Sequence, residues 1–347
     1  MNTKEYENRR NEILLTIIRT YIETAQPVGS QAVSKMSHLG VSPATIRNVM
    51  AELEEEGYLT HPHTSAGRIP TNKGYRFYVD HFLQEERLTK EEWHQIEAVY
   101  QKREKLAEEI MQKTAQLLSR MTQQVAVCVS PSLASSALKR FEMIPLENRR
   151  FILVLISNTG LVKNVVVDLE EEIHRDELIR LCNFLNSELS GMSLVETMAS
   201  LYRRLLDERG SFFHICKRAQ YILEQSGIMD AEEVFFLEGT GTILEKPEFQ
   251  NSERARPVLK ILEQKTPLLQ LLRQDGESEG LHIHIGEEHG LEEMRYCTLI
   301  TRTYRAGKAS HGTIGVMGPT RLDYSRAISV VESIASKLSE IAEAFGL

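Results

Sequence analysis

The sequence predicts an α+β multidomain protein. Apolar residues recur every three or four positions through most of the first eighty residues, which is the pattern of amphipathic helices. Further along, short apolar runs of strand length lie on both sides of a block with helical periodicity. Strands, then helices, then strands again indicate an antiparallel-sheet domain with a mainly helical insertion. The length of 347 residues fits two or three domains at about 100 to 200 residues each.

The composition excludes several classes of protein. The chain is 41% hydrophobic and 26% charged, as globular proteins are and disordered or fibrous chains are not. Its apolar runs are far shorter than the about 20 residues that cross a bilayer, and its polar start lacks the features of a secretory signal. The four cysteines lie far apart without a C-x-x-C pair, which argues against a disulfide framework and a zinc ribbon. We therefore expect a soluble, cytoplasmic protein that does not contact membranes.

The net charge of −8 is unevenly distributed along the chain. Residues 1–80 hold nine Lys and Arg against nine Asp and Glu, so the excess of acidic residues belongs to the rest. Contact with a polyanion is therefore expected at the N-terminal end, although a neutral segment does not by itself indicate nucleic acid.

Three helices are expected within the first sixty residues, at about 8–23, 30–38 and 42–57. Each has one apolar stripe with steps of three and four residues. Ser42 can cap the third helix, and Pro43 occupies its first position, where a backbone N–H is not needed. The second and third helices, joined by a short glycine-containing turn, predict a helix-turn-helix, which lays its second helix in the DNA major groove.

The outward face of the third helix is suited to reading DNA. At about 100° per residue it lies opposite an apolar stripe centred near Ile46. Arg47 can pair with guanine and Asn48 with adenine, small alanines let the helix approach the bases, and hydroxyls near the helix start can bond to phosphate. For an isolated helix, an ordinary solvated face is the alternative interpretation. The candidate DNA-binding residues on this helix are Ser42, Ala44, Thr45, Arg47, Asn48 and Ala51.

A β-hairpin is expected directly after the third helix. Two short extended segments, at about 58–60 and 68–70, flank a loop rich in Pro, Ser and Gly. A hairpin beside a recognition helix is a wing, and its donors and single cation suit phosphate or the minor groove. The pair His61-x-His63 is interpreted as turn histidines rather than a metal site, since no third ligand is nearby in the sequence. The candidate DNA-binding residues of the wing are His63, Thr64, Ser65 and Arg68.

Three nearly gapless segments of this region carry a specific resemblance. They are Pro27–Ser30, Val41–Glu54 and His61–Thr71, the last followed by Gly74-Tyr75-Arg76 and Tyr78-Val79-Asp80. These segments resemble the bacterial heat-inducible transcription repressors of the HrcA family. The resemblance implies a winged helix-turn-helix followed by a GAF-like domain with an inserted dimerising domain. It also implies repression of chaperone operons of the GroE and DnaK type, release on heat shock, and support of the active repressor by a GroEL-type chaperonin.

Two further helices are expected before the first sheet strand. One, at about 72–83, carries aromatic residues that are expected to pack in the core and between domains. A capping box formed by Thr89 and Glu92 begins the other, which is expected to run to about residue 123. At about 1.5 Å per residue, such a helix would span about 50 Å and set the distance between domains. A coiled coil is the alternative, but polar interruptions favour packing within its own domain.

The remaining chain alternates between strand and helix patterns. Strands are expected at about 125–129, 140–144, 151–157 and 161–168, helices at 175–189, 194–208, 212–225 and 256–273, strands at 281–286, 295–304 and 313–317, and then a terminal helix.

These patterns and the family resemblance divide the chain into four stretches. Residues 1–88 form the winged-helix DNA-binding domain, 89–170 the linker helix and the first part of the GAF-like domain, 171–230 the dimerising insertion, and 231–347 the second part of the GAF-like domain. A homodimer has a physical motive as well. Two recognition helices read two half-sites only if a two-fold axis relates them, so the expected operator is an inverted repeat in double-stranded DNA.

The sequence presents no catalytic constellation, and we expect neither an enzyme nor a cofactor or metal. His282 and His284 share one strand face and are interpreted as polar residues of a strand edge. There is no P-loop, nucleophile elbow or H-E-x-x-H motif. A regulator that senses a metabolite in the GAF-like domain is the alternative function. A helix-turn-helix enzyme would need a glycine-rich nucleotide loop, which the sequence lacks.

Overall fold

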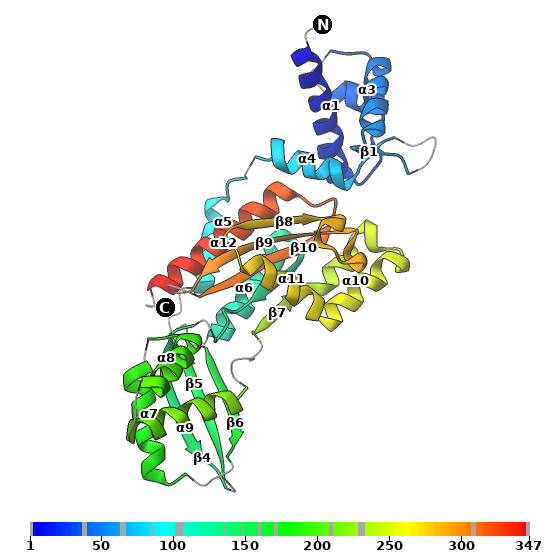
Figure 1. The fold of residues 1–347 in the computed structure, drawn as a ribbon. Helices are drawn as coiled ribbons and strands as arrows, with labels where there is room; N and C mark the ends of the chain where they lie inside the picture. The colour runs from blue at the N-terminus through cyan, green and yellow to red at the C-terminus, as the bar shows by residue number, and fades with distance from the viewer. Residues whose placement is uncertain are drawn as a thin grey trace.

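The protein is elongated, with three parts that follow one another in space (Figure 1). The N-terminal helices lie at one end, a five-stranded sheet with its helices in the middle, and a three-stranded sheet with its own helices at the other end. The computed structural model describes residues 3–36, 40–62, 67–84, 86–100, 107–134, 136–147, 149–158, 161–169, 173–189, 191–207, 211–227, 233–306 and 310–344.

The N-terminal module, defined here as residues 3–82, contains the elements that the sequence predicts. Its elements are α1 (Thr3–Thr24), α2 (Ser30–Met36), α3 (Pro43–Glu55), β1 (Leu59–Thr60), β2 (Ile69–Pro70) and α4 (Asn72–Phe82). Gly40 before α3 and Gly57 after it both have positive φ angles, of 63° and 80°. Residues with side chains rarely adopt this conformation, which explains why glycine stands at both turns.

The expectation of one long helix from Thr89 to about residue 123 is wrong. The capping box is present, since the Thr89 amide donates to Glu92 over 2.8 Å, but α5 spans Lys90–Tyr100 and α6 spans Ala107–Thr122. The Tyr100 hydroxyl lies 2.8 Å from the Thr114 hydroxyl. In a continuous helix, 14 residues would separate these groups by about 21 Å. The two helices therefore pack against each other, and no 50 Å rod links the domains.

The middle part, called the sheet domain here, is built on an antiparallel sheet with strand order β7-β3-β10-β9-β8. Its strands are β3 (Val125–Val129), β7 (Phe235–Glu238), β8 (Leu281–Ile285), β9 (Cys297–Arg305) and β10 (His311–Pro319). All five residues of β3 are buried, because helices cover both faces of the sheet. Alternate β3 residues join two different hydrophobic clusters, one shared with α6 and α12 and one shared with α10 and α11.

Helices and short 3₁₀ turns complete the sheet domain. They are η2 (Thr240–Glu245), η3 (Pro247–Phe249), α10 (Ser252–Gln264), α11 (Thr266–Gly276), η4 (Gly286–His289), η5 (Glu292–Met294) and α12 (Tyr324–Ala344). The single helix expected at 256–273 is in fact two helices. Lys265 between them has a φ of 60°, which a continuous helix does not allow.

The inserted unit, residues 133–227, is larger than the sequence suggested. Its elements are β4 (Leu138–Pro145), β5 (Arg150–Ser157), β6 (Val162–Asp168), α7 (Arg175–Leu189), α8 (Leu194–Asp207) and α9 (Ser211–Gln225). The three strands form their own sheet and share one hydrophobic core with the three helices. The expected start of the insertion at residue 171 is therefore wrong, because it would cut through this core and assign these strands to the other sheet.

One face of the three-stranded sheet carries a group of apolar side chains and lacks a covering layer among the described residues, although Arg140, Glu142, Asn164 and Asp168 share this face. The helices of the inserted unit pack on the other face (Figure 1). Val162 and Val166 on β6 are 48% and 55% exposed, and Ile144 on β4 is 47% exposed. Strand pairing aligns Ile144, Ile152 and Val166 in one row across the sheet. We call this surface the bare face, and it consists of Ile144, Ile152, Val154, Ile156, Val162 and Val166.

All four cysteines are free thiols. Cys128, Cys216 and Cys297 are buried, and Cys182 is partly buried. Burial raises the pKa of the Cys128 and Cys297 thiols, which disfavours the reactive thiolate. Within the described ranges, the structure has no helix long and apolar enough to cross a membrane.

Candidate nucleic-acid interface

The start of α3 is built as the sequence predicts. Ser42 is the N-cap, with extended backbone (φ −67°, ψ 151°), and its hydroxyl accepts the Thr45 amide over 3.2 Å. Pro43 occupies the first turn, where no amide donor is required. The hydroxyls of Ser42 and Thr45 lie 3.0 Å apart at the exposed end of the helix. Donors and the positive end of the helix dipole therefore meet here, as an anion requires.

The two faces of α3 differ sharply in exposure. Ile46, Val49, Met50 and Leu53 are at most 4% exposed and anchor the helix in the hydrophobic core. The opposite side carries the predicted reading residues, which are all exposed: Ala44, Thr45, Arg47, Asn48 and Ala51. In the described part of the chain, no hydrogen bond or ion pair engages the side chains of Arg47 and Asn48. Both are available for base edges.

The C-terminal half of α3 is acidic, and its carboxylates have partners within the module. Tyr6 donates to Glu52, and Arg10 pairs with Glu56. Glu54 pairs with both His61 and Arg68. Because phosphate repels carboxylates, these contacts favour an approach in which only the N-terminal half of α3 faces the DNA.

Backbone contacts hold the hairpin together and join it to the segment before α2. Leu59 pairs with Pro70 across the two strands. The backbone groups of Val28 and Arg68 exchange two hydrogen bonds of 2.9 Å each. A Cβ atom on Gly67 would lie 2.5 Å from the Val28 backbone, so only glycine permits this approach.

The predicted wing residues have different outcomes. His63, Thr64 and Ser65 lie outside the described residues. Arg68 is described, and its guanidinium lies 2.7 Å from a Glu54 carboxylate oxygen, with the side chain 25% exposed. Its charge is therefore already engaged within the protein, unlike that of Arg47.

Glu54 was not predicted as a functional residue, and local sequence patterns offer no signal for its role. It joins the recognition helix to the hairpin through His61 and Arg68, which follow it by 7 and 14 residues. Glu54 belongs to α3, whereas His61 and Arg68 belong to the hairpin that follows it, so only the folded hairpin brings these groups together.

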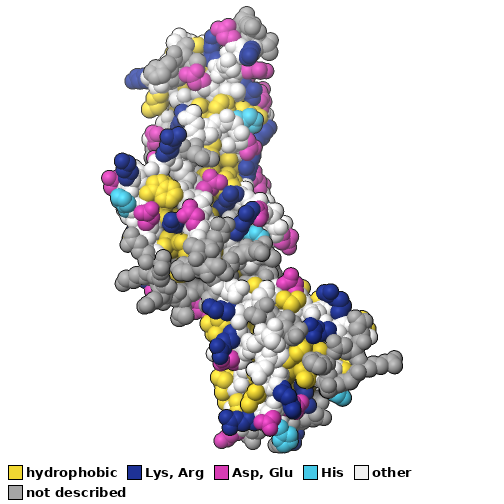
Figure 2. All heavy atoms as spheres, turned by 90° about the vertical axis from the view of Figure 1, so that its left-hand side faces the viewer, with side chains coloured by type: hydrophobic (Ala, Val, Ile, Leu, Met, Phe, Trp, Pro, Cys, Tyr) yellow, Lys and Arg dark blue, Asp and Glu magenta, His cyan; other side chains and the backbone are white. Residues whose placement is uncertain are grey.

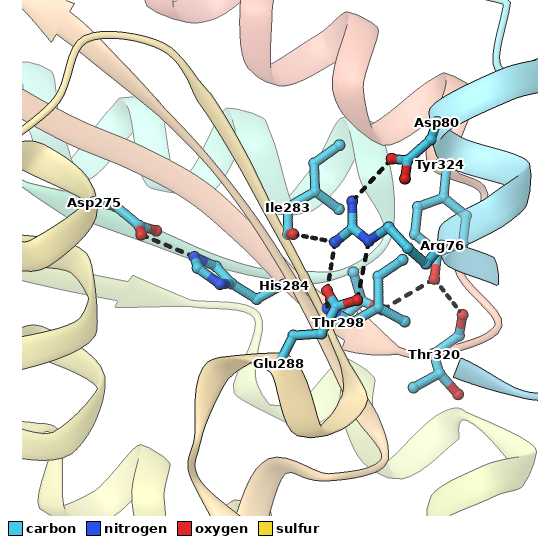
Figure 3. Close-up of polar contacts among 10 residues, drawn as sticks. Arg76, Asp80, Asp275, Ile283, His284, Glu288, Thr298, Thr320 and Tyr324 are labelled. Carbon is cyan, nitrogen blue, oxygen red and sulfur yellow. Dashed lines mark hydrogen bonds and ion pairs between the residues drawn. The ribbon is translucent and has the colours of Figure 1, made fainter. Parts of the chain in front are cut away.

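The two strand histidines belong to polar contacts inside the sheet domain. His284 Nε2 lies 2.8 Å from Asp275 Oδ1 (Figure 3). The Thr301 hydroxyl donates to Asp275 Oδ2 over 2.6 Å. Burial raises the pKa of Asp275, but the hydrogen bonds from His284 and Thr301 outweigh burial, and the pKa lies below its usual value. His282 lies 3.3 Å from the Ser278 hydroxyl. Among the described residues, no group of three His, Cys, Asp or Glu could hold a metal ion.

Two polar hollows on the sheet domain bear on the metabolite-sensing alternative. One, of about 470 Å³, lies beside Gly280, Arg302 and Ser336, and the other, of about 300 Å³, lies beside Ser130 and Thr313. In the first, Arg305 pairs with Glu279 at 2.8 Å. Small-molecule sites are mostly apolar and enclosed, and neither hollow has that character.

Comparison with known proteins finds a matching family model and close to full-length relatives. Residues 108–328 match the family model of the HrcA protein C-terminal domain. The chain is 38% identical over 333 residues to the heat-inducible transcription repressor HrcA of Desulforamulus reducens, covering 96% of each chain. It is also 38% identical over 337 residues to the repressor of the same name from Geobacter sulfurreducens, covering 97% of this chain and 98% of that one.

A solved structure shares the fold. A chain described as a hypothetical protein at 2.2 Å resolution superposes with a TM-score of 0.61 and 26% sequence identity, covering 97% of this chain and 98% of the other.

Proposed function

The chain belongs to the family of heat-inducible transcription repressors HrcA, and from this premise we propose that it binds an inverted-repeat operator as a homodimer. Family membership makes it a transcription repressor of the heat-shock response. The proposal adds that its targets are chaperone operons of the GroE and DnaK type, and that it acts in the cytoplasm.

We propose that α2 and α3 form the helix-turn-helix and that β1 and β2 form the wing. The observation that carries this assignment is the exposed, unengaged pair Arg47 and Asn48 beside two exposed alanines on α3. An arginine can bind guanine through two hydrogen bonds, and an asparagine can bind adenine in the same way. The Ser42 and Thr45 hydroxyls, at the helix start, are suited to the flanking phosphate.

In the proposed wing, Arg68 exchanges its partner Glu54 for a DNA phosphate. In the free protein its guanidinium is bound to Glu54. A phosphate close to the hairpin would compete for this partly exposed cation, while Glu54 would keep its contact with His61. Arg68 would then contact the DNA backbone, which carries no sequence information.

The GAF-like and dimerising assignments are also part of the proposal. The antiparallel sheet covered on both faces supports a GAF-like domain at residues 107–130 and 233–344. The bare face of the inserted unit supports dimerisation there, because exposed apolar area is unfavourable in water and a two-fold axis would bury the same patch on both copies.

Heat release needs no ligand in this proposal. Proteins are stable by only about 5 to 15 kcal/mol, so a modest rise in temperature can shift a repressor toward an inactive population. A GroEL-type chaperonin would return molecules to the active state, and competition from heat-damaged proteins would leave less chaperonin for the repressor.

The proposed function is tested by operator titrations with the Arg47→Ala variant. Loss of a bidentate base contact should cost about 1 to 3 kcal/mol at particular base pairs. Arg68→Ala should weaken binding more evenly across operator variants, because it removes a backbone contact. Arg203→Ala, which removes an equal charge from the exposed surface of α8 on the helical side of the inserted unit, is the control and should bind as the wild type does. An Arg47→Ala profile identical to wild type at every base pair would refute the assigned reading face.

A further inference from the structure

Two arginines cross the boundary between the N-terminal module and the sheet domain in opposite directions. Arg76, on α4 of the module, reaches the sheet domain, where its Nε donates to Glu288 over 2.9 Å and its Nη2 donates to both Glu288 and the Ile283 carbonyl (Figure 3). A further nitrogen of the same guanidinium lies 3.3 Å from Asp80 on α4. The planar guanidinium is therefore held from several directions, which fixes its orientation.

The second arginine makes the reciprocal contact. Arg321, just before α12, pairs with Glu248 at 2.6 Å, and each of these side chains is only 15% exposed. The same guanidinium donates to the Ile22 carbonyl in the last turn of α1. Carbonyls in a last helical turn lack partners within the helix, so a cation there both satisfies a bond and complements the helix dipole.

An aromatic contact lies between the two arginine contacts. The rings of Tyr75 and Tyr78 on α4 lie 5.9 and 6.3 Å from the ring of Tyr324. The Tyr324 hydroxyl is 3.1 Å from the Thr298 hydroxyl and donates to the Thr320 carbonyl over 2.7 Å. Its position is thus fixed from the sheet domain, and the hydrophobic cluster of the module continues into that domain without a break.

We propose that Arg76 and Arg321 are positioning residues that fix the direction in which each recognition helix points, and thereby the half-site spacing that the dimer accepts. This inference rests on the proposed function. The contacts lie at the end of the module where α4 meets the sheet domain, while Ala44, Arg47 and Asn48 remain exposed. The arginines therefore leave the reading face free, and their removal changes the orientation of α3 without changing its contacts to a single half-site.

The physical reason is geometric. A dimer gains affinity from its second half-site only if both recognition helices meet the same face of the DNA, one helical turn or a multiple of it apart. When the modules can rotate on the sheet domain, fewer conformations satisfy both half-sites at once, and the effective concentration at the second site falls.

The test compares three duplexes with the full-length protein. The first carries two half-sites at the spacing selected by the wild type from a randomised duplex pool. The second has about five base pairs inserted between them, which turns one half-site to the opposite face. The third carries a single half-site. We expect the wild type to bind the first duplex at least about tenfold more tightly than the second.

The Arg76→Ala/Arg321→Ala variant should lose this preference while binding the single half-site within about twofold of wild type. Arg76→Lys should lose part of it, because an ammonium keeps the charge but not the planar fork. The single variant Arg76→Glu should lose the spacing preference, and the charge exchange Arg76→Glu/Glu288→Arg should restore part of it. Arg203→Ala, on α8 and remote from both the boundary and the bare face, should keep it fully.

The outcomes separate the two proposals. Loss of the spacing preference confined to the boundary variants supports the inference. A double-alanine variant that keeps the wild-type preference overturns it and leaves the proposed function intact. A wild-type protein that selects no paired half-sites contradicts the proposed function and the inference together. If the double variant does not fold, the other two variants test the inference. A wild-type spacing preference in Arg76→Lys, or no recovery of the preference in the charge exchange, overturns it.

Discussion

The reading face of α3 and the bare face of the inserted unit are both uncovered, but for different physical reasons. On α3, the uncovered residues are two alanines, whose side chains are small, and a threonine, an arginine and an asparagine, which water solvates well. On the three-stranded sheet, six uncovered residues are isoleucines and valines, and Arg140, Glu142 and Asn164 lie among them. On the face of the molecule that Figure 2 shows, hydrophobic side chains are interspersed with charged ones.

The difference between these faces indicates what each can bind. Leaving apolar surface in water forgoes about 25 cal/mol for each Å² that a partner would bury, so an apolar face has a reason to associate even without charge or specificity. A polar face gains little from simple burial and needs a partner whose hydrogen-bonding groups match its own. Thus a second protein surface suits the sheet, while base edges and phosphates suit the helix.

The largest expected effect comes from placing a charge on the bare face. Val166→Glu should raise the dissociation constant of the dimer about a hundredfold or more, because the two-fold axis would bury the unpaired carboxylate of both copies. Binding to the two-half-site duplex should fall in parallel, while binding to one half-site should persist. Sedimentation velocity over a concentration series measures the first effect and titration the second.

Leu206→Glu is the matched control for this prediction. Leu206 on α8 is 86% exposed, yet it belongs to the helical side of the inserted unit. The variant should remain dimeric. Equal loss of dimer in both variants would mean that general surface hydrophobicity, rather than the bare face, holds the copies together.

A smaller effect is expected from enlarging a side chain on the reading face. Ala44→Leu should change the free energy of unfolding by less than about 0.5 kcal/mol, because the position is exposed. Operator affinity should nevertheless fall about tenfold or more, since the longer side chain would hold α3 away from the base edges. Thermal unfolding and operator titration are the two measurements.

Glu55→Leu adds a similar apolar side chain at the far end of the same helix. Glu55 is exposed and lies in the acidic half, which the proposal keeps away from the bases. It should weaken operator binding far less than Ala44→Leu does. Similar losses in both variants would remove the distinction between the two halves of α3.

The smallest effect on function is expected from a polar group that neither face uses. Asp275 is 4% exposed and accepts hydrogen bonds from His284 and Thr301. Asp275→Asn should lower the free energy of unfolding by about 1 to 3 kcal/mol near neutral pH, because an amide cannot accept both bonds in the same way. Dimerisation and operator binding at low temperature should not change.

The pH dependence follows from the lowered pKa of Asp275. A carboxyl group whose pKa is lower in the folded state stabilises the protein above its unfolded pKa of about 3.9, and this contribution disappears as the pH falls through the folded pKa. The gap between wild type and Asp275→Asn should therefore narrow below about pH 4. Asp168→Asn, at a 78% exposed site, should show no comparable gap at any pH.

The sequence predicted the N-terminal module well because its signals are local. Ser42 and Thr71 mark helix starts by accepting backbone amides three residues on, Pro43 marks one because it has no amide donor, and the glycines mark turns. The same local reasoning failed between residues 89 and 170. A helical stripe does not reveal that α5 and α6 fold back on each other, and an apolar strand does not reveal which sheet it joins.

The sequence by itself determined which residues form the helices of the N-terminal module, which side of α3 is buried, and which family the N-terminal segments resemble. All three depend on groups within a few residues of one another, where chain geometry fixes the spacing of side chains. Only the tertiary structure decided that Glu54 holds Arg68, that β4 to β6 leave one apolar face bare, and that Arg76 and Arg321 join two domains. Across the domain boundary these two arginines meet partners 207 to 299 residues away, and contacts at such separations arise from how whole elements pack.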